Sequence, residues 1–330
     1  MTHAIRSLGQ RRSDMEQVGK VSIICIAFNH EKWIVKAIES VIHQDYGAKD
    51  LIIVDNGSSD QTAIIIQDWV KKNSPGSAVS VICKSEVKPY CKLFDEMLNL
   101  TTGEFVVDLS GDDFLYPNHL SRSVERLKQV PNAAFVFSNA TICEENGTQE
   151  SYYESKDVKD LKGKILGREF YQTLISRSFI SSPTVVFRSK ILKIEGGYDM
   201  SLSYEDFDVQ LRLTSKYPVV FSDHVGVYKR KHAQSLSANQ YQRYQSAMLP
   251  STLRVCEKIR EMNKTFSEDV ALKNRVLYEL KHSLWSANFQ VAKGFVNLAD
   301  ELEIKGMELR LYKIWLLLRL DMSWLYVQLT

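Results

Sequence analysis

The sequence lacks the marks of several classes of protein. Its 330 residues include five cysteines without a CxxC pair, which argues against a disulfide framework or a zinc site and favours a reducing compartment. No run of about 18 apolar residues occurs without interruption, so we expect no membrane-spanning helix. Lysine and arginine outnumber aspartate and glutamate by only 2, which argues neither for nor against a polyanionic partner, and we expect no nucleic-acid partner.

Residues 1–20 are polar and basic, with Arg6, Arg11 and Arg12 among them. Because no apolar segment follows, we expect a disordered lead-in rather than a secretory signal. The composition, with 44% hydrophobic and 25% charged residues, is that of an ordinary globular protein. The length allows one large α/β domain and an accessory region.

Strand-like and helix-like segments alternate from Val21 onward. Val21–Phe28 is an apolar run rich in β-branched residues, which predicts a strand buried on both faces. Asn29 is placed to cap the next helix, which reaches Ile42. We expect further strands over 50–55, 79–84, 104–109 and 133–138, and helices over 61–72, 89–100 and 117–128. This alternation predicts βαβ units and a mostly parallel sheet flanked by helices.

The regular alternation of strand and helix patterns ends after about residue 140. Residues 144–165 are charged and irregular, which predicts a loop or short insertion. We expect a strand over 182–188, a turn at Gly196-Gly197, a helix over 205–215 and short strands over 219–221 and 225–228. Helical patterns over 243–262, 268–296 and 303–329 then predict a helical C-terminal extension.

Two adjacent carboxylates follow the fourth expected strand. Residues 106–109 run directly into Ser110-Gly111-Asp112-Asp113. Unpaired charge is costly in a core, whereas carboxylate oxygens suit Mg²⁺ or Mn²⁺. Ligands of open α/β sheets also bind at the carboxyl ends of strands. The stretch therefore predicts a metal-assisted site for a phosphorylated ligand, with a turn that leads into the helix near Pro117 as the alternative.

Three further groups of polar residues lie at the ends of elements. Asp55 either contacts a ribose hydroxyl or base N–H of a ligand, or hydrogen-bonds its own turn. Glu205 and Asp206 begin a helix, where the helix dipole alone favours carboxylates, or where one of them serves as a general base. The cluster from Tyr228 to His232 is either a solvated surface or a diphosphate site, with His232 as metal ligand or phosphate contact.

In this order the motifs resemble those of the family 2 glycosyltransferases, inverting enzymes with the nucleotide-binding GT-A fold. The resemblance covers about residues 21–238 and implies a GT-A catalytic domain over that range, followed by a helical extension over 239–330. The matching pieces are Ala27-Phe28-Asn29, Leu51 through Thr62, Gly103-Glu104 through Asp112-Asp113, Pro117-Asn118, Gly196-Gly197-Tyr198-Asp199, Glu205-Asp206-Phe207-Asp208 with Arg212, and Tyr228 through His232 with Ser235.

The resemblance also implies a role for each matching position. It implies catalysis by Asp206 as general base beside Glu205, and substrate contacts at Asp113 and Arg230. It implies a divalent cation, Mn²⁺ or Mg²⁺, at Asp112 and His232. The positions expected to contact the nucleotide are Ala27, Asn29, Asp55, Ser110, Gly111 and Asp112.

The chain departs from the family pattern at a few positions. Ser110 stands where the metal motif has its first acid, so Asp112 has to carry more of the metal binding. Asp95 stands at a helix position that is often Asn. The QxxRW signature of processive polysaccharide synthases is absent, which favours transfer of one sugar per binding event.

The activity implied is transfer of one sugar from a nucleoside-diphosphate sugar, most commonly UDP-linked, to a hydroxyl of a glycan or lipid-linked acceptor. The implied setting is bacterial polysaccharide or lipopolysaccharide synthesis on the cytoplasmic side. Two alternatives remain open from the residues, a nucleotidyltransferase and a non-catalytic transferase-like scaffold. Ser110 is the only support for the scaffold.

The C-terminal segment allows two interpretations. Residues 309–320 are apolar with interspersed arginine and lysine, and Trp324 and Tyr326 follow. Such a helix either packs on the catalytic domain or lies on a membrane surface. The second interpretation implies a peripheral contact with the inner face of the plasma membrane.

Overall fold

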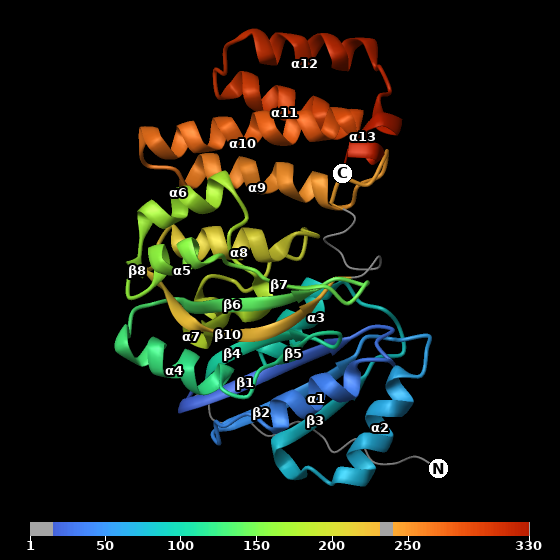
Figure 1. Ribbon diagram of the computed structural model, residues 1–330, viewed down its shortest axis with the longest axis vertical. Helices are drawn as coiled ribbons and strands as arrows, with labels where there is room; N and C mark the ends of the chain where they lie inside the picture. Colours follow the sequence, from blue (N-terminus) through green and yellow to red (C-terminus); the bar gives the residue numbers. More distant parts are fainter. Residues whose placement is uncertain (1–15, 232–239, 330) are drawn as a thin grey trace.

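The computed structural model describes residues 16–231 and 240–329. Figure 1 shows a curled sheet in the lower half of the molecule and a stack of C-terminal helices above it. The sheet has ten strands, and its hydrophobic contacts form one core on each face. This is the α/β sheet flanked by helices, with a helical C-terminal region, that the sequence predicts.

The first half of the sheet is parallel. Its strands lie in the order β3-β2-β1-β4, and these are β1 (Gln17–Ala27), β2 (Lys49–Asp55), β3 (Val79–Cys83) and β4 (Gly103–Ser110). The apolar run of β1 is buried from Val21 to Ala27 because helices cover both faces of the sheet.

The second half of the sheet is mixed. It continues beyond β4 with β9 (Val186–Arg188), β6 (Phe135–Cys143), β10 (Val219–Arg230) and β5 (Phe114–Leu115), while β7 (Gln149–Ser151) pairs with β6 and β8 (Ile165–Leu166) with β10. β6 and β10 are parallel, whereas β9 is antiparallel to both of its neighbours.

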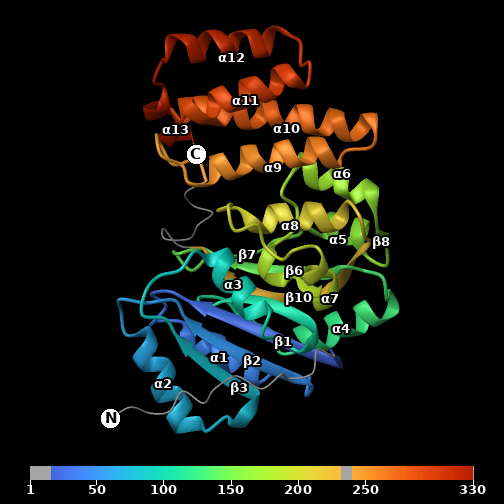
Figure 2. The same cartoon turned by 180° about the vertical axis from the view of Figure 1, so that it is seen from behind.

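Helices cover the two faces in two groups. One face carries α1 (Ile34–Ile42), α2 (Thr62–Asn73) and α4 (His119–Gln129). The other carries α3 (Tyr90–Leu98), α5 (Ser155–Leu161), α6 (Arg168–Ser176), α7 (Ser189–Ile194) and α8 (Glu205–Thr214). Figure 2 views the molecule from the opposite side, and there α3 and α7 lie in front of the sheet. Short 3-10 turns occur at Gly76–Ala78 and Ser182–Thr184.

The C-terminal helices stack beyond α8, as both views show. They are α9 (Met248–Met262), α10 (Phe266–Trp285), α11 (Phe289–Glu301), α12 (Met307–Leu318) and α13 (Ser323–Leu329). Among the described residues, no helix combines the length and the apolar character that crossing a bilayer requires.

One hydrophobic core joins these helices to the sheet. It runs from Phe137 and Phe221 through Phe207 of α8 to Leu272 and Phe295. We predicted a boundary between catalytic domain and extension at residues 238 and 239. These residues lie within the segment 232–239, which the structure does not describe, so the boundary stays a prediction.

Several local expectations are wrong. Asn29 does not cap a helix, because α1 begins at Ile34 and Trp33 precedes it. The two short strands expected near residues 219–228 form the single strand β10, in which the register shifts between Ser222 and Val227. The irregular stretch 144–165 contains β7, α5 and the first residue of β8.

Two long helices expected at the C-terminus are each divided. Ala287 has φ +56 between α10 and α11, and Arg319 has φ +48 after α12. A left-handed residue ends a helix, so the chain turns there. α11 then packs back on α10, and α13 also contacts α10. The apolar periodicity continues through both turns, which is why the sequence pattern does not reveal them.

Candidate functional site

Three of the predicted nucleotide-binding residues lie at one edge of the sheet. Ala27 is the register partner of Asp55 in β2, and Ile26 is the partner of Ser110 in β4. The strands are parallel, so all three carboxyl ends meet at this edge, where open α/β sheets bind ligands.

Gly111 brings the loop after β4 against the end of β1. Its N–H donates to the carbonyl of Ile26 at 2.9 Å. A Cβ on Gly111 would lie 2.8 Å from His30 Nδ1 and 2.9 Å from the Cβ of Ala27. Only glycine permits this approach, so the predicted residues Ala27 and Gly111 form one surface.

Asn29 ties the loops after β1 and β2 together. It has φ +57, its Oδ1 accepts the Ser59 N–H at 2.8 Å, and its own N–H donates to Ser58 Oγ at 2.9 Å. Asn29 therefore shapes the edge through the backbone of the neighbouring loop. A direct contact between Asn29 and a nucleotide stays a prediction.

The two carboxylate oxygens of Asp55 have different surroundings, which bear on the two interpretations raised from the sequence. Oδ2 accepts the Ser58 N–H at 3.3 Å, as a turn residue would. Oδ1 is buried and has no hydrogen bond among the described residues, although Asp55 is only 2% exposed. A buried carboxylate oxygen without a donor is costly. A ribose hydroxyl or base N–H would satisfy it.

Hydrogen bonds join Arg230 to Asp112 and Asp113. The backbone N–H of Arg230 donates to Asp113 Oδ1 at 2.8 Å, and the Arg230 guanidinium donates to the backbone carbonyl of Asp112. Burial, aided by the neighbouring Asp112 carboxylate, raises the pKa of Asp113 to about 8. The pair joins the loop after β4 to the end of β10. Their expected contacts with substrate stay predictions.

The Arg230 side chain lies over three aromatic rings, one of them that of Trp33 at 5.9 Å. Its guanidinium carbon is 5.6 Å from the ring centroid of Phe114 and 5.3 Å from that of Tyr228. These rings stack on each other with centroids 4.5 Å apart. The stack holds a permanent positive charge beside Asp112, where a diphosphate would need one.

Asp112 is the main candidate metal ligand of the described chain. In residues 16–231 and 240–329 no group of three or more His, Cys, Asp or Glu side chains converges on a metal position. His232, the second predicted ligand, lies outside the described residues. The donors present, the Asp112 carboxylate and the Ser110 hydroxyl, fit an ion such as Mg²⁺. Such ions take one or two protein carboxylates and complete their shell with substrate phosphates and water.

The two predicted catalytic carboxylates lie in the first turn of α8. Asp206 Oδ1 accepts the N–H of Phe207 at 2.7 Å, and Oδ2 accepts the hydroxyl of Ser182. Gln210, one turn further along α8, donates to the same hydroxyl oxygen at 3.4 Å. These bonds fix the direction of the Asp206 carboxylate, as a general base requires.

A third carboxylate, Asp108 of β4, lies in the same cluster and is not among the predicted site residues. Tyr90 and Tyr198 donate their hydroxyls to its two oxygens at 2.6 and 2.9 Å. Burial raises the pKa of Asp108 to about 6, with a smaller contribution from Asp206 and against the two tyrosine bonds. The signal in the sequence was a lone carboxylate inside an apolar strand.

Glu205, the neighbour of Asp206 in the cluster, has a raised pKa. Burial raises its pKa to about 8, and the charges of Asp206 and Asp108 add to this. The raised pKa favours the protonated form of Glu205. The three carboxyls from two elements then hold less negative charge than their number implies.

Tyr198 is fixed by a network around the Gly196-Gly197 turn. Its ring stacks on Phe94 with centroids 4.4 Å apart, and its N–H donates to Asp95 Oδ1 at 3.1 Å. Gly197 has φ +63, and a Cβ there would collide with the Asp95 carboxylate. Arg212 donates to the carbonyl of Gly197 at 2.6 Å. Asp95 therefore holds the tyrosine that holds Asp108.

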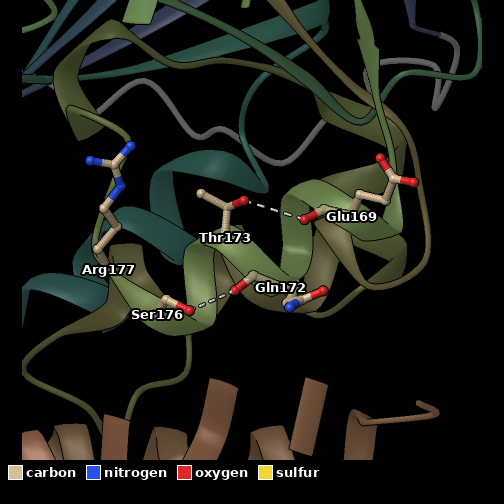
Figure 3. Close-up of a pocket in the computed structure, with 5 residues that line it drawn as sticks. All are labelled: Glu169, Gln172, Thr173, Ser176 and Arg177. Atoms are coloured by element: carbon tan, nitrogen blue, oxygen red, sulfur yellow. Dashed lines mark hydrogen bonds between the residues drawn. The ribbon is translucent and has the colours of Figure 1, made fainter. Parts of the chain in front are cut away.

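Two hollows of the surface lie apart from these residues. One of about 350 Å³ follows the outer side of α6. Figure 3 shows that its Thr173 and Ser176 hydroxyls bond to carbonyls of their own helix. The other, of about 440 Å³, lies beside Tyr116, Asn118 and Thr141. Neither is lined by a predicted site residue, so the site is defined by the sheet edge and the carboxyl cluster.

A known protein family matches the part of the chain that carries most of the motifs. The model of the family described as "Glycosyl transferase family 2" matches residues 22–193, just over half of the chain. An uncharacterized glycosyltransferase of Rickettsia typhi is 25% identical over 230 residues, which are 68% of this chain and 69% of that protein.

Other relatives are longer than this chain. Protein CgeD of Bacillus subtilis is 29% identical over 41% of the chain and 33% of its own length. Poly-beta-1,6-N-acetyl-D-glucosamine synthase of Staphylococcus epidermidis is 25% identical over 61% of the chain and 47% of its own length. The chain thus spans less than half of either protein.

Solved structures share the fold over nearly the whole chain. Residues 1–349 of TarS from S. aureus, in complex with UDP-GlcNAc, match with a TM-score of 0.68 and 17% identity, covering 94% of this chain and 92% of that one. The mannosyltransferase PcManGT from Pyrobaculum calidifontis, in complex with GDP-Man and Mn²⁺, matches with a TM-score of 0.59 and 15% identity, covering 91% and 84%. The predicted fold class is confirmed.

Proposed function

Because the chain belongs to glycosyl transferase family 2, we propose that it transfers one sugar from a nucleoside-diphosphate sugar to an acceptor hydroxyl, with inversion at the anomeric carbon. The observation that carries the proposal is the position of Asp108. It lies two residues before Ser110 in the strand that leads to the nucleotide edge, and it is close enough to Asp206 for that charge to raise its pKa. Asp108 thus links the helix of the candidate base to the strand of the candidate nucleotide edge, which supports the proposal.

Asp206 is the general base of the proposed reaction. An acceptor hydroxyl is a poor nucleophile until its proton is removed, and a positioned base contributes about 10²–10⁴-fold in rate. The hydroxyl oxygen attacks the anomeric carbon, the bond from that carbon to the diphosphate oxygen breaks, and the proton passes to Asp206. A single displacement of this kind inverts the anomeric centre.

The leaving diphosphate gathers negative charge as its bond to the sugar breaks. Arg230 supplies one fixed positive charge beside the loop, and Asp112 with Ser110 would hold a divalent cation. When bound, such an ion stabilises the developing charge as a Lewis acid. The unsatisfied Oδ1 of Asp55 accepts from the ribose or base of the same nucleotide.

Two similar proteins support a class of sugar donor and a cellular role. TarS was solved with UDP-GlcNAc, and the Staphylococcus epidermidis relative is a poly-beta-1,6-N-acetyl-D-glucosamine synthase. We therefore propose a UDP-linked sugar as donor, a glycan or lipid-linked acceptor, and a role in cell-envelope polysaccharide synthesis on the cytoplasmic side.

The stereochemistry of a slow transfer to water or to a simple alcohol tests the mechanism without the natural acceptor. The protein is incubated with UDP-GlcNAc, UDP-glucose or GDP-mannose, with Mn²⁺, and the first-formed anomer is read by proton NMR. The proposal predicts release of the nucleoside diphosphate and formation of the inverted anomer from at least one donor. A retained anomer would refute the mechanism.

A parallel incubation with a nucleoside triphosphate and a sugar 1-phosphate, together with the donor incubation, separates the two alternatives raised from the sequence. A nucleotidyltransferase would form a nucleotide-sugar from nucleoside triphosphate and sugar phosphate and release pyrophosphate. A non-catalytic scaffold would neither bind nor turn over any of the donors. Either result would replace the proposed function.

A further inference from the structure

The charged form of Asp206 is opposed by its neighbours. The charge of Asp206 contributes to the raised pKa of both Glu205 and Asp108, and like charges oppose each other's ionisation. Burial, with the charge of Asp206 as the second cause, raises the pKa of Tyr152 to about 12 and also raises that of Tyr204. Both phenols therefore favour their neutral form and supply no counter-charge.

No ion pair balances Asp206 in the part of the chain that the structure describes. None of the ion pairs formed within residues 16–231 and 240–329 includes its carboxylate. Arg177 is close enough to lower the pKa of Tyr152, but it pairs with Asp157 at 3.7 Å. The ionised form of Asp206 therefore depends on its hydrogen bonds.

Two donors make these bonds, one to each oxygen. The N–H of Phe207 donates to Oδ1 at 2.7 Å, and the hydroxyl of Ser182 donates to Oδ2. The first donor is the backbone of α8 itself, which remains whatever side chain stands at position 207. The second is a single side chain from another part of the chain. Hydrogen bonds to an ionised group are about twice as strong as neutral ones.

The sheet holds Ser182 in place. Ser182 begins the 3-10 turn that packs against β4, β6 and β10. The N–H of Thr184 donates to the carbonyl of Ser181, and that of Val185 to the carbonyl of Ser182, both at 3.0 Å. Thr184 and Val185 are fully or almost fully buried. The hydroxyl that reaches Asp206 is thus fixed to the same sheet that carries the candidate nucleotide edge.

Gln210 sets the direction in which the Ser182 hydroxyl donates. It is 3% exposed, and its amide nitrogen donates to Ser182 Oγ at 3.4 Å. A hydroxyl has one proton to donate. Because Oγ accepts from Gln210, that proton is directed to Asp206. The three side chains form a chain of one polarity, from amide to hydroxyl to carboxylate.

We propose that Ser182 and Gln210 are positioning residues for the transfer reaction, which keep Asp206 ionised and oriented to take the proton of the acceptor hydroxyl. The inference rests on the proposed function, in which Asp206 is the general base. Ser182 keeps its own proton throughout, and the proton of the acceptor passes to Asp206. Neither Ser182 nor Gln210 belongs to the sequence motifs that indicate the family.

Steady-state kinetics of Ser182→Ala test the proposal, with the donor that the parent protein turns over and a simple alcohol as acceptor. We expect kcat to fall roughly 10- to 100-fold, the value of a hydrogen bond to a charged group, while the KM for the donor changes little. The loss should shrink as the pH rises from about 5 to about 9, because a carboxyl without its donor ionises at higher pH. Ser182→Thr keeps the hydroxyl and should restore most of the rate. Gln210→Leu should lower kcat roughly 2- to 10-fold.

Ser178 provides the matched control in the segment that leads to Ser182. Its hydroxyl bonds to that of Tyr204 at 2.7 Å, so it contacts the start of α8 without contacting Asp206. Ser178→Ala should keep the kcat and the pH profile of the parent protein. Equal losses in Ser178→Ala, Ser182→Ala and Ser182→Thr would reveal a general disturbance of this segment and would overturn the proposal.

Thermal unfolding tests the hydrogen bond apart from the reaction. A donor to a carboxylate stabilises the fold fully only while the carboxylate is ionised. The difference in melting temperature between the parent protein and Ser182→Ala should therefore be larger at about pH 7 than at about pH 4. A difference that does not depend on pH would contradict the proposal.

Asp206→Asn, measured alongside, separates a failure of this inference from a failure of the proposed function. A parent-like rate in Asp206→Asn would refute the general base and this inference with it. A low rate in Asp206→Asn together with a parent-like rate in Ser182→Ala would overturn this inference alone.

Discussion

Asp55 is a residue whose two interpretations predict opposite results. If its unsatisfied oxygen receives a nucleotide, Asp55→Asn should weaken UDP binding roughly 10- to 100-fold, the value of hydrogen bonds to a charged group. The free protein should then melt at the same or a higher temperature, because a half-satisfied buried charge has been removed. Titration calorimetry measures the affinity and thermal unfolding the stability.

Asp60 provides the matched control in the same loop. Its oxygens accept the N–H groups of Thr62 at 2.9 Å and Glu31 at 3.1 Å, so its bonds are made within the chain. Asp60→Asn should lower the melting temperature and leave UDP affinity unchanged. If Asp55→Asn behaves in the same way, Asp55 is a turn residue and the nucleotide does not reach it.

Glu205 makes stability depend on pH in a defined window. Its pKa is about 8 in the folded protein and 4.5 in the reference state, so the folded state binds the proton more tightly. Its contribution to stability is complete below about pH 4.5 and is lost as the pH rises to about 8. Glu205→Gln removes this loss. The melting temperature of the variant relative to the parent should therefore rise from pH 5 to pH 8 and stay level above, and a flat difference would contradict the account.

At the residue scale, most candidate site residues could be identified from the sequence, but their hydrogen-bond partners could not. Ala27, Asp55 and Ser110 were each identified by a motif, and parallel pairing places them at one edge. Asp108 was missed because its neighbours in space, Tyr90 and Tyr198, lie 18 and 90 residues away along the chain. A local pattern carries no information on such contacts.

Contacts with the C-terminal helices hold α8, the helix that carries the candidate base Asp206. Asp208 of α8 is fully buried between Arg212, at 2.7 Å, and Lys258 of α9, at 2.8 Å. Arg275 of α10 lies over the ring of Phe207 at 4.8 Å and pairs with the buried Glu279 at 2.8 Å. The orientation of α8 thus depends on contacts with residues 50 or more positions further along the chain.

Removing one member of the Arg275–Glu279 pair should be costly. Their side chains are 5% and 0% exposed, so Arg275→Met leaves a buried, uncompensated carboxylate and should cost about 3–5 kcal/mol in denaturant unfolding. Arg275→Met with Glu279→Gln should recover most of that loss, because the charge is gone and an acceptor remains for Tyr241. Equal losses in the single and double variants would contradict a charge-based explanation.

Element types were predictable wherever a period was strong and uninterrupted. β2, β4 and the start of α8 lie where the apolar pattern places them, whereas β1 begins at Gln17, within the expected disordered lead-in of residues 1–20. The breaks at Ala287 and Arg319 were not predictable, because neither residue is a glycine or proline and left-handed backbone there is imposed by tertiary packing. The short elements within residues 144–165 have too few residues to show a period.

The whole molecule should unfold as one unit. The core that contains Phe137 of the sheet also contains Leu272 and Phe295 of the C-terminal helices, so the helices cannot melt without exposing the apolar side of α8. We expect a single calorimetric transition whose van't Hoff and calorimetric enthalpies agree. Two separated transitions would instead support independent domains on either side of residues 238 and 239.

The central claim is that Asp206 removes a proton at a site whose nucleotide binds at the edge formed by β1, β2 and β4. The most direct test measures UDP release from the preferred donor and UDP affinity together, in the parent protein and in Asp206→Asn. We predict that release falls about 10²–10⁴-fold while affinity stays within about twofold. Release at the parent rate by Asp206→Asn would contradict the claim, and so would loss of UDP binding in a variant that melts like the parent.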